Sequence, residues 1–159
     1  PRQRIVTLRA WFAKWIAEMR EGGAQRPYES FQDFADRMRA ENPRLTEERA
    51  LFLAQNWGKE EPDGTVVRRA DPKHTLINPL PIPTEDMLAC WRQISAQVLW
   101  VEGAKSGLGA RIARDPEGYQ ARCEAIRDLN IVRVEDAGHN VHHDQPEELA
   151  MVIEQFMKQ

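Results

Sequence analysis

The sequence predicts an α/β fold in which a helical first half precedes two parallel strands and their flanking helices. Residues 98–101 form a continuous apolar run, Val-Leu-Trp-Val, as in a strand that is covered on both faces of a parallel sheet. A second strand is expected at 131–135, and helical patterns precede, separate and follow the two strands, which is typical of crossover connections. Because two strands do not make a stable parallel sheet alone, the rest of the sheet is expected outside this chain.

The composition indicates a globular domain and argues against nucleic-acid and membrane partners. Apolar residues make up 42% and charged residues 30% of the 159 residues, which is normal for a globular protein. The 22 basic residues are scattered and the formal net charge is -3, so no dense basic patch favours nucleic acid. No apolar run approaches the roughly 18–20 residues of a membrane span. The charged stretch from Pro1 to Arg20 does not resemble a signal peptide.

Two further features concern location and completeness. Cys90 and Cys123 lie in predicted helices, at a spacing that suggests neither a disulfide framework nor a zinc site. We therefore expect two half-buried thiols in a reducing cytoplasm. The chain begins with Pro1 and reads as helix from its first residues, so we expect a fragment or a processed chain.

Residues 1–83 are predicted to form a helical cap or lid with a connector. A first helix ends at Gly22-Gly23, a second begins at Ser30 with Asp33 in an imperfect capping box, and Thr46 caps a third. The three apolar stripes are Ile5, Leu8, Phe12, Trp15, Ile16 and Met19; Phe31, Phe34, Ala35 and Met38; and Ala50, Leu53, Ala54 and Trp57. Prolines and Asp63-Gly64 make residues 58–83 a loop-rich connector, with a brief extended piece at 65–68.

Residues 84–159 are predicted to hold both strands and three helices. Thr84 is expected to cap the first helix, Asp115-Pro116 to open the second, and Asp144 to cap the third, with Pro146 and Glu147 in its first turn. The inward residues of these helices are expected to be Met87, Leu88, Trp91 and Ile94; Tyr119, Cys123 and Ile126; and Leu149, Val152, Ile153 and Phe156.

The most informative stretch follows the second strand. There a glycine, Gly138, turns the chain, His139 follows, and a helix begins a few residues later. This order places the imidazole of His139 on a loop at the carboxyl edge of the sheet, where catalytic groups gather in open α/β folds. Gly138 removes side-chain bulk beside it, so a nucleophile from a neighbouring strand could approach.

Residues 134–149 resemble the last strand, catalytic-histidine loop and final helix of the α/β-hydrolase superfamily, and residues 98–103 resemble the strand before it. The helical first half resembles the cap domain that this family inserts. The resemblance implies that His139 is the general base of an esterase-like hydrolase, with no metal or organic cofactor. The family's nucleophile lies in a Gly-x-Ser-x-Gly elbow. No such elbow occurs here, so a missing N-terminal region or partner chain is expected to supply it, and the chain alone is expected to be inactive.

The sequence leaves open which residue is the catalytic acid that would pair with His139. The family often places an aspartate three residues after the glycine that ends the strand, and here Gly103 is followed at that spacing by Ser106. The acid could lie upstream of Pro1, which we favour, or Glu102 could substitute, or the site could lack an acid. Asp136 is too near His139 along the loop and more simply structures the turn.

The remaining histidines, tyrosines and tryptophans allow other interpretations. His139, His142, His143 and Asp144 lie within a span that short zinc motifs use. However, Asp144 is better explained as a helix cap, which leaves no well-placed fourth ligand, and we expect His142 and His143 to be exposed. Tyr28 could polarise an epoxide, although only Tyr119 is available as its pair. The five tryptophans are expected in the core: Trp11, Trp15, Trp57, Trp91 and Trp100.

Two function classes besides the hydrolase remain. A non-catalytic scaffold or partner protein with the same architecture is favoured by Ser106, and a metal-binding module would need zinc on the histidine cluster. The substrate is not predicted, because ester hydrolases, haloalkane dehalogenases, epoxide hydrolases and carbon–carbon hydrolases share this C-terminal pattern.

Overall fold

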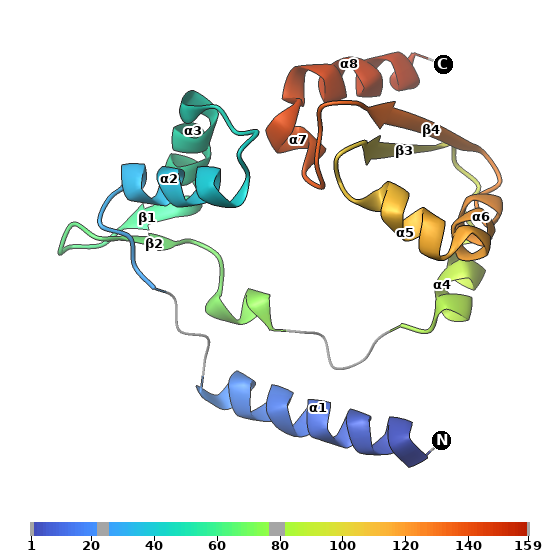
Figure 1. Ribbon diagram of the computed structural model, residues 1–159, viewed down its shortest axis with the longest axis horizontal. Coiled ribbons are helices and arrows are strands. Elements are labelled where there is room, and N and C mark those ends of the chain that lie inside the picture. The colour runs from blue at the N-terminus through green and yellow to red at the C-terminus, as the bar shows by residue number, and fades with distance from the viewer. Residues whose placement is uncertain (1, 22–25, 77–81, 159) are drawn as a thin grey trace. The chain divides into compact units, whose positions relative to one another are not determined.

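The computed structural model describes residues 2–21, 26–76 and 82–158. The chain divides into two compact units, Pro1–Pro81 and Ile82–Gln159 (Figure 1). Gly22 and Gly23, predicted to end the first helix, lie outside the described residues, as do the side chains of Ile5 and Leu8. The role of residues 1–83 as a lid stays a prediction. Among the described helices, none is long and apolar enough to cross a membrane.

The described residues of the first unit form three α-helices, as predicted: α1 (Arg2–Glu21), α2 (Phe31–Glu41) and α3 (Glu47–Trp57). Both predicted caps are confirmed, since Ser30 Oγ accepts from the Asp33 N–H and Thr46 Oγ1 accepts from the Arg49 N–H, each at 3.1 Å. The core of the unit is Phe34, Ala35, Met38, Leu45, Ala50, Leu53, Ala54 and Val66. Trp57 and Trp11 do not belong to it, because they are 45% and 47% exposed, so their predicted burial is wrong.

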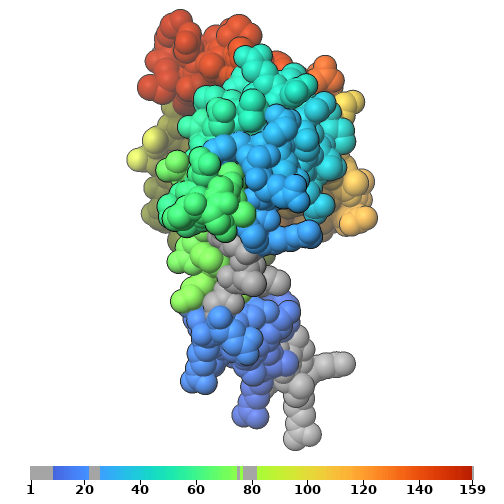
Figure 2. Space-filling view, turned by 90° about the vertical axis from the view of Figure 1, so that its left-hand side faces the viewer, coloured from blue at the N-terminus to red at the C-terminus, as the bar shows by residue number. Residues whose placement is uncertain are grey.

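The first unit also contains a short antiparallel hairpin, which β1 (Gly58–Glu60) and β2 (Val66–Arg68) form. The 3-10 helix η1 (Pro72–Thr75) follows it. The extended piece at 65–68 was predicted, but β1 was not. Figure 2 shows α2, α3 and the hairpin packed together as one block. A Cβ atom at Gly58 would stand 2.7 Å from both the Ala54 carbonyl oxygen and Val66 Cγ1, so the glycine allows the strand to leave α3 in close contact with it.

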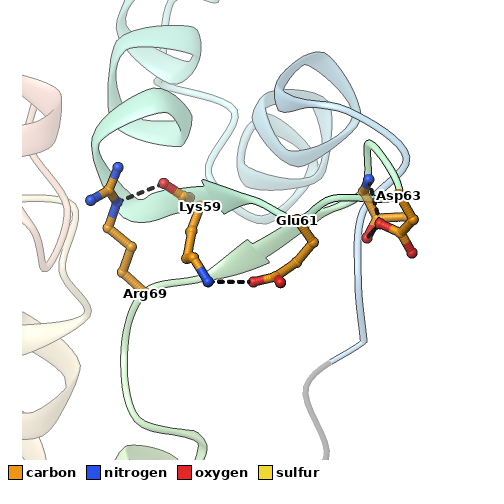
Figure 3. Close-up of polar contacts among 6 residues, drawn as sticks. Lys59, Glu61, Asp63 and Arg69 are labelled. Carbon is orange, nitrogen blue, oxygen red and sulfur yellow. Dashed lines mark hydrogen bonds and ion pairs between the residues drawn. The ribbon is translucent and has the colours of Figure 1, made fainter.

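Polar contacts hold the hairpin in shape (Figure 3). At the turn, the Thr65 N–H and hydroxyl both donate to Asp63 Oδ1, at 3.0 and 2.7 Å, and these bonds lower the pKa of the Asp63 carboxyl. Gly64 takes a φ of 84°, which glycine adopts without strain. Lys59 Nζ pairs with Glu61 Oε1 at 2.9 Å on the exposed side.

The second unit contains the two predicted strands, β3 (Val98–Gly103) and β4 (Leu129–Val134), which pair in parallel as expected. Its helices are α4 (Thr84–Trp91), α5 (Leu108–Arg114), α6 (Pro116–Glu124), α7 (Val141–Asp144) and α8 (Pro146–Met157). The parallel register aligns Val98 with Leu129 and Gly103 with Val134, so both strands end at the same edge. Asp115 Oδ1 accepts from the Gly118 N–H at 2.9 Å, which confirms the predicted start of α6.

Two predicted helix caps are wrong. Pro83 occupies the N-cap of α4, which makes Thr84 the first helical residue instead of its cap. Asp144 belongs to α7, and Gln145 stands at the N-cap of α8 without a side-chain cap. The sequence reading missed α5 and α7, because each is shorter than the two turns that a periodic apolar pattern needs to appear.

The strands of this unit are less buried than the sequence predicts. Residues 98–101 were expected to be covered on both faces, yet all four are only half-buried, and Ile131 is 40% exposed. On α8 the predicted inward residue Ile153 is 45% exposed, while Leu149, Val152 and Phe156 are half-buried. Residues that read as core in the sequence therefore stay partly uncovered in this unit.

Candidate active site

The candidate active site is the edge at which β3 and β4 end. The last paired residues, Gly103 and Val134, stand opposite each other. Backbone hydrogen bonds join the loops that follow: the Ala104 N–H donates to the Val134 carbonyl at 2.9 Å, and the Lys105 N–H to the Ala137 carbonyl at 2.8 Å. Figure 1 shows α7 at the end toward which both strand arrows point. This carboxyl edge is where open α/β folds place ligands and catalytic groups.

Gly103 allows the two loops to touch. A Cβ atom built on Gly103 would overlap the carbonyl oxygen of Gly138 and stand 2.6 Å from the carbonyl oxygen of Ala137. Any side chain here would push apart backbone segments that the hydrogen bonds hold together, so only glycine fits. The position of the loop that carries His139 thus depends on the glycine that ends the neighbouring strand.

Buried contacts hold this loop on both sides of His139. Three apolar residues around it form one buried cluster: Val134, Ala137 and Val141. Asp144 Oδ2 accepts from the Gly138 N–H at 2.7 Å, so a carboxylate from α7 fixes the peptide group next to His139. This bond replaces the capping role predicted for Asp144. His139 itself is exposed. The result is an accessible imidazole on a firmly held backbone, an arrangement that suits proton transfer to a separate reactive group.

The neighbouring histidines differ from each other. His142 is exposed, as expected, whereas His143 is 8% exposed, so its predicted exposure is wrong. Their ring centroids lie 4.0 Å apart, with the two ring planes 61° from each other. Across residues 2–21, 26–76 and 82–158, no three histidine, cysteine, aspartate or glutamate side chains gather as a metal site would require.

Glu102, one of the candidates for the acid, is buried and fully engaged. It is 3% exposed, and its two oxygens accept from different partners: Oε1 from the Tyr119 hydroxyl at 2.8 Å and Oε2 from Arg133 at 3.3 Å. Burial raises the pKa of the Tyr119 phenol, and the hydrogen bond to Glu102 raises it further, so this hydroxyl stays protonated and keeps donating. No hydrogen bond joins Glu102 to His139 within the described part of the chain. This geometry favours a structural role.

Ser106, which stands where the family often has its acid, and Asp136, which lies near His139 in the sequence, both take part in local turn contacts. Ser106 Oγ accepts from the Leu108 N–H at 3.3 Å, and the Ser106 N–H donates to the Gly103 carbonyl at 3.0 Å, in the turn that leads into α5. Asp136 is exposed, and its backbone carbonyl accepts from Gln145 Nε2 at 3.5 Å. The sequence analysis did not predict the contacts of Glu102 with Tyr119 and Arg133, nor the hydrogen bond from the Gly138 N–H to Asp144. The signal that could have found the first of these is a glutamate next to an apolar strand run, because a buried charge without a partner is costly.

Comparison with known proteins identifies the fold. No family model matches the chain, and no curated protein matches it. Among solved structures, it is similar to the thioesterase domain from the curacin biosynthetic pathway, with 23% identity, a TM-score of 0.73, and coverage of 91% of this chain and 50% of that one. An esterase from Mycobacterium tuberculosis is 18% identical, with a TM-score of 0.66 and coverage of 86% and 45%.

A third similar structure is an α/β hydrolase from Novosphingobium aromaticivorans, 15% identical, with a TM-score of 0.56 and coverage of 89% of this chain and 50% of that one. The predicted fold is therefore confirmed: the chain has the fold of a portion of an α/β hydrolase. It spans about half the length of the structures that it matches.

Proposed function

We propose that this chain is the C-terminal portion of an α/β hydrolase that cleaves an ester, or another small substrate attacked by the same relay, with His139 as the general base. The observation that supports this most is the exposed imidazole on a buried, hydrogen-bonded loop at the carboxyl edge of two parallel strands. The similar structures include a thioesterase and an esterase, which supports hydrolysis as the reaction class.

In this reaction His139 takes the proton of a nucleophile, or activates the water that resolves the covalent intermediate. The chain's serines are Ser30, Ser95 and Ser106, and none lies in a Gly-x-Ser-x-Gly elbow. We therefore assign the nucleophile, the oxyanion hole and the remaining strands to a segment upstream of Pro1 or to a partner chain. The charge partner of His139 is assigned to the same region, because Glu102 is committed to Tyr119 and Arg133.

The 159-residue chain alone is expected to show no esterase turnover above the buffer background, because the nucleophile is not part of it. The measurement is release of 4-nitrophenol from 4-nitrophenyl acetate at a series of chain concentrations. The His139→Ala variant of the same chain is the control for adventitious hydrolysis. Turnover that scales with the chain and disappears in His139→Ala would show that the nucleophile lies within these residues.

The Glu102→Gln substitution separates the two candidate positions of the acid. In the complete enzyme we expect kcat to fall less than about tenfold, since glutamine keeps the shape of the side chain and the acid lies elsewhere. Loss of the catalytic acid would instead lower kcat by about 10⁴-fold. The free energy of unfolding should fall by about 1–3 kcal/mol, because the buried hydrogen bonds from Tyr119 and Arg133 lose their charged acceptor. A 10⁴-fold loss of kcat with unchanged stability would identify Glu102 as the acid.

The runner-up function, a non-catalytic scaffold with this architecture, makes the opposite prediction for the complete protein. Its upstream sequence would lack a nucleophile elbow, and a fluorophosphonate probe would not label it.

A further inference from the structure

A cavity of about 360 Å³ lies in the first unit, at the end of α3. Small-molecule sites span about 300–1,000 Å³, so its size suits a small ligand. Its lining residues are Asn56, Trp57, Arg68, Arg69, Ala70 and His74. All of them belong to one compact unit, so the cavity does not depend on how the two units are placed.

Trp57 gives the cavity an apolar wall. It continues the apolar stripe of α3, yet 45% of it is exposed, whereas Leu53 and Ala54 one turn earlier are buried in the core. A large aromatic side chain that stays partly uncovered beside a concavity has a surface on which a ligand gains apolar contact.

Arg69 supplies a fixed positive charge at this wall. Its Nε donates to the Gly58 carbonyl at 2.7 Å and its backbone N–H to the Trp57 carbonyl at 2.7 Å. Figure 3 shows the Arg69 guanidinium reaching the start of β1, apart from the pair of Lys59 and Glu61. These two bonds satisfy carbonyl groups at the end of α3, but they use none of the terminal amino groups of Arg69. Those groups have no acidic partner within the described ranges.

The rest of the lining contains no negative charge. Arg68 also lines the cavity, but its guanidinium lies over the Phe34 and Tyr28 rings, with its Cζ 5.5 and 6.0 Å from the ring centroids, so Arg69 is the arginine that supplies charge to the cavity. The lining contains His74 but neither aspartate nor glutamate. Arginine forks bind planar carboxylates through two parallel hydrogen bonds, and such charge-assisted bonds are stronger than neutral ones.

We propose that this cavity binds a small carboxylate that carries an apolar or aromatic group. The carboxylate pairs with the terminal amino groups of Arg69, and the apolar group packs on Trp57. The ligand class also fits the proposed reaction, because ester hydrolysis releases a carboxylate. Its identity as substrate or product rests on the proposed function, whereas the binding itself does not.

Three probe molecules test the proposal on the unmodified chain by isothermal titration calorimetry. 3-Phenylpropionate has both features, 3-phenylpropionamide has the same shape without the charge, and acetate has the charge without the ring. We expect 3-phenylpropionate to bind at least tenfold more tightly than either of the other two. Equal affinity for the acid and the amide would overturn the proposal, as would failure of the acid to bind at concentrations up to its solubility.

Variants then locate the site. Arg69→Gln should weaken binding of 3-phenylpropionate at least tenfold and leave the weaker binding of the amide unchanged. Trp57→Ala should weaken both. Arg39→Gln is the matched control, since Arg39 is an exposed arginine of the same unit that does not line this cavity. An equal loss of affinity for 3-phenylpropionate in Arg39→Gln and Arg69→Gln would mean that the ligand responds only to the net charge of the unit. This result would overturn the assignment of the site to Arg69.

Circular dichroism of each variant confirms that it folds, and the comparison of acid with amide needs no variant. The result is also separable from the proposed function. If the chain binds 3-phenylpropionate but the complete protein shows no hydrolysis that depends on His139, the binding site is supported and the proposed hydrolase function is wrong. If the complete protein hydrolyses esters through His139 but the chain does not bind 3-phenylpropionate, only the binding site is wrong.

Discussion

Replacing His139 with glutamine in the complete protein is expected to lower kcat by at least about 10³-fold, because the reaction that we propose would lose its general base. Glutamine keeps a polar side chain at an exposed position, so the fold should be unaffected. The measurement is kcat from steady-state hydrolysis of an activated ester. His142→Gln is the matched control, since His142 is an exposed histidine three positions further along the chain.

The control variant should keep kcat within about threefold of the wild type, as surface substitutions usually have small effects. Similar losses of kcat in His139→Gln and His142→Gln would mean that both substitutions disturb the structure of the loop, and not that one imidazole is the general base. A loss of less than tenfold in His139→Gln would remove His139 from the relay.

The Gly103→Ala substitution is expected to lower the free energy of unfolding by about 3 kcal/mol, because overfilling a tightly packed site costs this much. The added methyl group would overlap the Gly138 carbonyl oxygen, so β3 and the His139 loop must move apart. The measurement is urea denaturation of the chain. In the complete enzyme, the same substitution should also lower kcat, since the imidazole moves with its loop.

Gly109→Ala is the control for this substitution. A Cβ atom at Gly109 meets nothing within 4 Å, and the residue lies inside α5. Alanine there should raise the free energy of unfolding by about 0.5–1 kcal/mol, because it favours the helix. An unchanged stability of Gly103→Ala would show that the two loops are not in contact.

Local signals in the sequence predicted much of the fold. Ser30, Thr46 and Asp115 act on peptide groups three residues away, so their capping roles could be predicted from spacing alone. The apolar run at 98–101 likewise predicted β3, because a continuous apolar strand has few alternatives once its length excludes a helix. The strand, glycine and histidine in succession placed His139 on a loop at the sheet edge, where the structure has it.

Other features depend on contacts and on limits of the core that residue spacing does not show. Asp144 had the residue type and position of a helix cap, but the N–H of Gly138 takes its carboxylate instead. Trp57 continued a buried stripe, but it is the last residue of α3 and 45% of it is exposed. The pairing of Glu102 with Tyr119 and Arg133 joins positions 17 and 31 residues apart, which spacing does not reveal.

The most direct test of the account is a crystal structure of the complete protein after reaction with a fluorophosphonate. We predict a covalent bond to the phosphonate from a residue upstream of Pro1 or of a partner chain, with a ring nitrogen of His139 about 2.6–3.2 Å from the oxygen of that residue. A phosphonate that is attached elsewhere, or a different side chain in the place of this imidazole, would contradict the account.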